Sequence, residues 1–115
     1  MSLDTWYFAF VILQLFHSQE EIHTGFYKRS PIFAMPKKVF VTFEILFSLF
    51  IVSFVIFKQL PLRNIWVPLF ILLMFANGVE HFLWWLAERK YVPGIFTAAI
   101  ALLMFIGFYF SEFVI

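Results

Sequence analysis

Long apolar runs separated by short polar stretches dominate this sequence. Four such runs predict helices at about residues 4–24, 37–59, 65–88 and 93–113. Each is about 20 residues or longer, which is the length an α-helix needs to cross the hydrocarbon core of a bilayer. The connections are short, so neighbouring helices should be antiparallel. The pattern therefore predicts an all-α membrane protein, with residues 1–115 forming one four-transmembrane-helix bundle.

Residues typical of helix ends support these limits. Asp4 is a candidate N-cap of the first helix, and Gly25 is a candidate residue just after its end. Asn64 is a candidate cap of the third helix. Pro93 stands where the fourth helix should begin, a position that proline favours. The predicted helices thus begin and end at residues suited to those places.

The first helix is the least strongly indicated span. Its apolar run, from Trp6 to Phe16, is too short to cross a bilayer alone. It spans only if the polar residues from His17 to Glu21 belong to the same helix, and the alternative is a re-entrant or interfacial helix. The segment lacks the basic start and the small-residue cleavage site of a signal peptide, so we expect it to be retained.

Composition agrees with a membrane protein. The chain is 63% hydrophobic and 13% charged, whereas soluble domains are about half apolar and a quarter charged. A soluble core of 115 residues could not bury so many apolar side chains. A net charge of +1 gives no indication of nucleic-acid binding, and the absence of cysteine excludes disulfides, thiolate metal sites and cysteine nucleophiles.

The distribution of lysine and arginine predicts an orientation. Six of the eight lie in the first and third predicted connections: Lys28, Arg29, Lys37, Lys38, Arg89 and Lys90. Only Lys58 and Arg63 lie in the second. Because positive residues favour the cytoplasmic side, we expect both termini outside, in a plasma or inner membrane.

Polar side chains gather toward the cytoplasmic end of every predicted helix. They are His17, Glu20, Glu21, Glu44, Asn77, Glu80, His81, Tyr91 and Thr97. A carboxylate inside a membrane segment costs about 2.5–3.5 kcal/mol on insertion scales, so it marks a functional site by default. Helical spacing places His17, Glu20 and Glu21 on one face, and it places Asn77 and His81 on another. The sequence therefore predicts one buried polar site near the cytoplasmic leaflet.

Three motifs occur in order along the chain: His17-x-x-Glu20-Glu21, Asn77-x-x-x-His81 and Tyr91-x-Pro93-Gly94-x-x-Thr97. This set resembles the family of small membrane proteins named for its HXXEE motif, whose function is undefined and which is thought to be enzymatic. The resemblance implies that the motif residues form the functional site without naming the reaction. Glu44 and Glu80 lie outside the motifs, and whether they join the site is left open.

The residue types favour a metal-dependent enzyme, a hydrolase or oxidoreductase acting on a small lipophilic or lipid-like substrate. His17, Glu21 and His81 would form a three-ligand set that suits Zn, Fe or Mn and leaves a position for water or substrate. The other carboxylate, Glu20 or Glu21, would be the general base. The remaining catalytic candidates are Asn77 as a hydrogen-bond donor, Tyr91 as a proton donor, and Thr97, which with Tyr91 would line the mouth.

Other functions use the same residues. One is metal-free acid–base catalysis, an isomerase or cyclase acting on a lipophilic substrate, because burial shifts carboxyl groups toward neutral pKa values. A small proton-coupled transporter and a structural subunit are the others. The expected partners are membrane lipids and a small lipophilic ligand, with no nucleic acid. A homodimer is also considered, since four helices are few to enclose a pocket.

Overall fold

The computed structural model describes residues 2–115, and every regular element in that part of the chain is helical. The prediction of an all-α fold is thereby confirmed. The elements are α1 (Leu3–Thr24), α2 (Phe26–Arg29), α3 (Lys37–Ile56), α4 (Arg63–Glu88), α5 (Ile95–Tyr109) and the π-helical turn η1 (Phe110–Val114).

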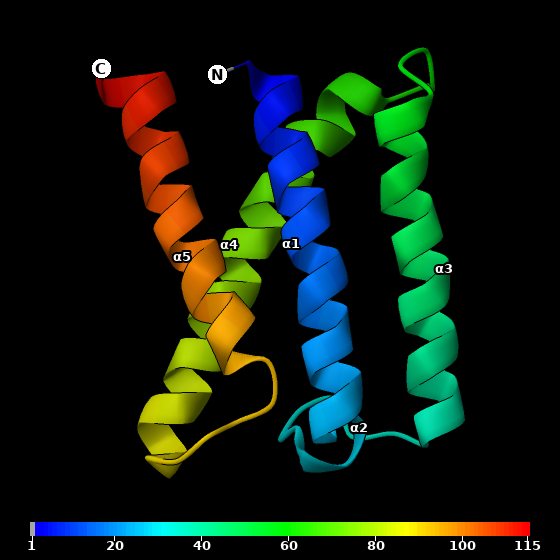
Figure 1. Ribbon diagram of the computed structural model, residues 1–115, viewed down its shortest axis with the longest axis vertical. Helices are drawn as coiled ribbons and strands as arrows, with labels where there is room; N and C mark the ends of the chain where they lie inside the picture. Colours follow the sequence, from blue (N-terminus) through cyan, green and yellow to red (C-terminus); the bar gives the residue numbers. More distant parts are fainter. Residues whose placement is uncertain (1) are drawn as a thin grey trace.

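Helix α1 lies at the centre of the bundle and packs against α3, α4 and α5. Figure 1 shows α4 crossing diagonally behind α1, with α3 and α5 on either side. The two ends of the chain and the α3–α4 connection lie at one end of the molecule (the terminal end). The α1–α3 and α4–α5 connections lie at the opposite end (the loop end). The up-and-down path expected from short connections is therefore present.

The ends of α1 follow from local capping. The hydroxyl of Ser2 accepts a hydrogen bond from the Thr5 backbone N–H at 3.2 Å, so Ser2 rather than Asp4 is the N-cap. Gly25 caps the other end as predicted. Its φ of +81° is a left-handed conformation that glycine adopts without strain, and its N–H bonds to the Glu21 carbonyl.

The other helix limits differ from the expected ones by a few residues. Helix α3 ends at Ile56 rather than near residue 59, and α4 begins at Arg63, so Asn64 lies inside the helix. Helix α5 begins at Ile95, after Pro93 and Gly94. Gly94 has a φ of +91° and is the residue that turns the chain into α5.

Three helical segments are long and apolar enough to cross a membrane: Lys37–Ile56, Arg63–Glu88 and Ile95–Val114. This finding indicates a membrane protein. Helix α1 has 22 residues but is not among the three. Its polar residues, which include Gln14, His17 and Glu21, lower its mean hydropathy.

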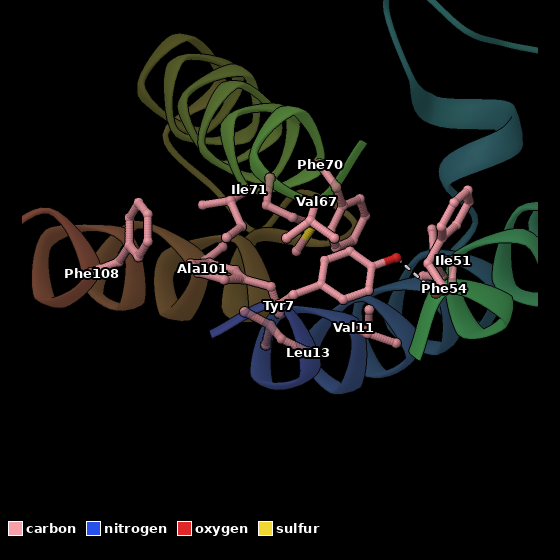
Figure 2. Close-up of a cluster of buried hydrophobic side chains, with 12 residues drawn as sticks. Tyr7, Val11, Leu13, Ile51, Phe54, Val67, Phe70, Ile71, Ala101 and Phe108 are labelled. Carbon is pink, nitrogen blue, oxygen red and sulfur yellow. Dashed lines mark hydrogen bonds between the residues drawn. The ribbon is translucent and has the colours of Figure 1, made fainter. Parts of the chain in front are cut away.

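A large apolar cluster holds the terminal end of the bundle together (Figure 2). Tyr7 of α1 is fully buried at its centre. Its hydroxyl donates to the Ile51 carbonyl of α3 at 2.7 Å, drawn as a dashed line in Figure 2, and accepts from Trp66 Nε1 of α4 at 3.0 Å. Because a buried hydroxyl must be hydrogen-bonded, this one residue fixes three helices relative to one another.

A second, smaller cluster closes the loop end. It consists of Phe26, Phe40, Trp84 and Val92. Phe26 comes from the short helix α2, and its ring centroid lies 5.7 Å from that of His81. The polar site described next therefore lies between two apolar layers.

Candidate functional site

His17, Glu21 and His81 meet in the interior of the bundle. His17 and Glu21 are one turn apart on α1, and His81 faces them from α4. Glu21 Oε1 lies 3.5 Å from His17 Nε2, and Glu21 Oε2 lies 3.2 Å from His81 Nε2. The three residues are 2%, 4% and 0% exposed. The two imidazole rings are perpendicular, with centroids 4.8 Å apart.

Three of the four imidazole nitrogens at this point lack a hydrogen bond. His17 Nε2 and both ring nitrogens of His81 are buried and have no hydrogen-bond partner within residues 2–115. Buried polar atoms are nearly always satisfied, so such orphans need an explanation. One ligand atom from each of His17, Glu21 and His81 lies within 4.8 Å of the others, which is close enough for the three residues to hold one metal ion.

Thr97 sets the orientation of His17. Its hydroxyl lies 2.6 Å from His17 Nδ1 and 2.7 Å from Glu20 Oε1. An ionised carboxylate only accepts hydrogen bonds, so Thr97 donates to Glu20 and accepts from Nδ1–H of His17. In a neutral imidazole that assignment leaves Nε2 of His17 unprotonated and near Glu21. Metal-binding histidines are commonly held in this way through their second nitrogen.

Glu20 lies on a different side of α1 from Glu21 and fastens that helix to the start of α5. Its carboxylate accepts from the Tyr91 hydroxyl at 2.5 Å, from the Phe96 backbone N–H at 3.2 Å, and from Thr97 through both its backbone N–H at 2.9 Å and its hydroxyl. The N-terminus of a helix also attracts a negative charge. In this arrangement Glu20 joins α1 to the start of α5, and its catalytic role stays a prediction from the sequence.

Tyr91 lies in the connection between α4 and α5. Partial burial and the hydrogen bond to the Glu20 carboxylate both raise the pKa of its phenol above the ordinary value. The residue therefore stays neutral and holds Glu20. Neither Tyr91 nor Thr97 is among the residues that line the cavity described below, whereas the sequence suggested that both line the mouth of the site.

Gly94 covers the polar cluster. A Cβ atom at this position would lie 2.7 Å from His81 Cε1 and 2.8 Å from His17 Cε1, closer than real contacts allow. Its φ of +91° also disfavours any other residue. Gly94 lies in the third motif, but no role in the chemistry was predicted for it. The structure shows that a side chain here would displace both imidazoles.

A cavity of about 670 Å³ adjoins the cluster. It lies between α1, α3 and α4, and the connection before α3 contributes Phe33 and Met35. Its polar lining residues are Gln14, His17, Glu21, Glu44, Asn77 and Glu80, and the other lining residues are apolar. Small-molecule pockets have this size and this mostly apolar character.

The cavity brings together several residues whose participation the sequence left open or missed. Glu44 of α3 and Glu80 of α4 both line it, and Glu80 Oε2 lies 3.7 Å from His81 Nε2. Asn77 also lines the cavity, and its role as a hydrogen-bond donor stays a prediction. Gln14 was not predicted. It lies one turn before His17 on the same face of α1, and that spacing was the available signal.

Comparisons with known proteins agree with the motifs. The chain matches none of the curated proteins and none of the solved structures with which it was compared. Residues 8–110 match the family model described as "Protein of unknown function with HXXEE motif". The match covers most of the chain and confirms the resemblance drawn from the three motifs. The chain therefore belongs to the HXXEE-motif family, whose function is unknown.

Proposed function

We propose that this protein crosses the membrane four times, binds one divalent metal ion through His17, Glu21 and His81, and acts as an enzyme on a small lipophilic molecule held in the adjoining cavity. The observation that carries the proposal is the convergence of buried, unpartnered imidazole nitrogens on one carboxylate beside a large apolar cavity. Unsatisfied nitrogens in the interior are costly, and a metal ion removes that cost.

The burial pattern of α1 supports a fourth span. In the middle of this helix the exposed residues are Phe8, Ile12 and Phe16, which form an apolar stripe with one residue per turn. The polar residues Gln14 and His17 are buried against the other helices. At a rise of 1.5 Å per residue, the 22 residues extend about 33 Å, enough to cross the hydrocarbon core. Helix α1 thus presents an apolar surface to lipid in its middle turns despite its low mean hydropathy, and the exposed residues Gln19 and His23 follow toward the loop end.

The orientation follows from the positions of the basic residues. The loop end carries the connections that contain most of the lysine and arginine residues, so the positive-inside rule places it in the cytoplasm and both termini outside. Ion pairs occur at both ends. Arg63 Nη1 lies 2.8 Å from Asp4 Oδ1 at the terminal end, and Arg29 Nη2 lies 3.8 Å from Glu88 Oε1 at the loop end.

The donor set and its neighbours support metal-dependent chemistry. Two imidazoles and one carboxylate suit Zn, Fe or Mn, and three protein ligands leave a coordination position open. Such an ion supplies Lewis acidity and an acidified water near neutral pH. Glu80 lies outside the ligand set with its Oε2 atom 3.7 Å from His81 Nε2, so it is the candidate proton acceptor. Asn77 is placed to donate to an oxygen of the substrate. These roles fit a hydrolase or an oxidoreductase.

One observation favours a second candidate function. The 3.2 Å separation of Glu21 Oε2 and His81 Nε2 is short enough for proton transfer without any ion. Metal-free isomerisation or cyclisation of a lipophilic substrate is therefore the competing proposal, and it uses the same cavity.

Elemental analysis of the detergent-purified protein separates the two. The metal proposal predicts about one equivalent of Zn, Fe or Mn in the wild type and its loss in the double variant His17→Ala/His81→Ala. The matched control is His23→Ala, because His23 lies on the same helix but is exposed. Wild-type protein without metal after reconstitution with each ion, or equal metal content in the double variant, would overturn the metal proposal and favour acid–base chemistry.

A further inference from the structure

We propose that the cavity binds an amphiphile whose polar end donates hydrogen bonds and carries no negative charge. A long-chain amine fits best, and a long-chain alcohol fits next. Glu44 binds this polar end. The inference names the substrate class of the site and so rests on the proposed function for its catalytic meaning. The binding claim can be tested by itself.

Glu44 is a buried carboxylate with an unused acceptor. Glu44 lines the cavity from α3, the residue is 5% exposed, and its buried Oε2 atom has no hydrogen-bond partner among residues 2–115. Leaving such an atom unsatisfied costs about 1–3 kcal/mol, and more when the group is charged. A rotation of the Glu44 side chain would bring this oxygen to an ammonium or hydroxyl group of a ligand in the cavity, which would supply the missing donor.

The charges of the residues that line the cavity determine which polar groups of a ligand can bind there. Glu21, Glu44 and Glu80 line the cavity, and within the described chain no lysine or arginine does. A fatty-acid carboxylate or a lipid phosphate would therefore meet like charges with no cationic side chain to pair with it. A divalent ion on the three-ligand set adds positive charge at Glu21. It leaves Glu44 and Glu80 facing the cavity, so the preference for a cationic or neutral end remains.

The apolar part of the lining accounts for the rest of the ligand. Phe47 of α3 and Phe70 of α4 pack with ring centroids 6.2 Å apart and bound the cavity toward the terminal end. Phe43 and Leu73 also line it but are 57% and 45% exposed, so they form an open apolar edge between α3 and α4. In a bilayer that edge faces hydrocarbon, and a lipophilic chain would reach the cavity from the side.

Photolabelling of the nanodisc-reconstituted protein tests the inference. The probes are dodecylamine, dodecanol and dodecanoic acid, each with a diazirine in the alkyl chain, and labelled residues are identified by mass spectrometry. We expect saturable labelling of cavity residues on α3 and α4, with the amine labelled at least about tenfold more efficiently than the acid. Equal labelling by amine and acid, or labelling confined to the outer helix faces, would overturn the inference.

Substitution of Glu44 tests whether this residue causes the preference for the amine over the acid. Glu44→Gln keeps an acceptor but removes the charge, so amine labelling should fall about tenfold while alcohol labelling changes little. Glu112→Gln is the matched control, because Glu112 is exposed and does not line the cavity. If Glu44→Gln does not fold, Ala76→Trp narrows the cavity without removing a polar group and should reduce labelling by all three probes. An unchanged amine-to-acid ratio in Glu44→Gln, or unchanged labelling in Ala76→Trp, would contradict the inference.

Metal analysis of the same samples keeps this inference separate from the proposed function. Amine-selective labelling of a protein that binds no metal would overturn the metal proposal alone. Stoichiometric metal with no amine preference would overturn the ligand inference alone.

Discussion

Glu21 of α1 and His81 of α4 lie 3.2 Å apart between Oε2 and Nε2, both of them almost completely buried. This contact joins the first and second motifs of the chain at one point. It also brings the central helix against the helix that crosses behind it (Figure 1).

Replacement of Gly94 by alanine should disrupt the polar cluster. The new Cβ would approach His81 and His17 within 2.8 Å, and the φ of +91° adds strain of about 1–3 kcal/mol. We expect a lower unfolding temperature in detergent together with reduced metal binding. Gly107→Ala is the control, because its Cβ would meet only Trp6 Cη2, at 3.7 Å. If the two variants unfolded at the same temperature and bound metal equally, the covering role of Gly94 would be refuted.

Thr97→Val should weaken metal binding without touching a ligand. The substitution removes the hydroxyl between His17 Nδ1 and Glu20 Oε1, so the ring of His17 is no longer held with Nε2 unprotonated. Loss of such a supporting contact typically lowers metal affinity 10–100-fold. Metal titration with a competing chelator measures the effect. Thr97→Ser keeps the hydroxyl and should bind metal nearly as well as the wild type. A valine variant that matched the serine variant would contradict the assignment.

Tyr91 should make stability sensitive to alkaline pH. Its pKa is raised in the folded protein by burial and by the bond to Glu20, so the folded state holds the phenolic proton more tightly than the unfolded state. The resulting stabilisation is fully present below the ordinary tyrosine pKa of about 10 and is lost as pH rises through the higher folded value. Unfolding temperatures measured from pH 8 to 11 should fall more steeply for the wild type than for Tyr91→Phe. Parallel curves would show that Tyr91 does not contribute.

Single cysteines can report the topology, because the native chain has none. With four spans and cytoplasmic connections at the loop end, a membrane-impermeant maleimide should label Ser2→Cys and Gln59→Cys in intact cells. It should label Ile32→Cys only after permeabilisation, and all three positions are exposed. Labelling of Ser2→Cys only after permeabilisation, with Gln59→Cys still labelled from outside, would show that α1 does not cross. Labelling of Ile32→Cys from outside would reverse the orientation.

Much of the fold could be read from local sequence features. The apolar runs located the four long helices, and Gly25 marked the end of α1, because both signals act within one turn or one helix. The limits near Asn64 and Pro93 differed from the structure because Leu62 and Gly94 take left-handed conformations there. A left-handed conformation is unusual for leucine, so residue propensities do not predict it at Leu62.

The sequence by itself determined the class of the protein, the helices and the set of polar residues that gather near one end of them. It did not determine which of those residues contact one another in the folded protein. Glu20 and Glu21 are neighbours in the chain, and side chains one residue apart on a helix point about 100° apart. Only the packing of α1 decided that Glu21 meets His81 while Glu20 meets the start of α5. The packing of α3 and α4 likewise places Glu44 and Glu80 at the cavity. Side chains point outward all around a helix, and packing against neighbouring helices determines which of them are buried.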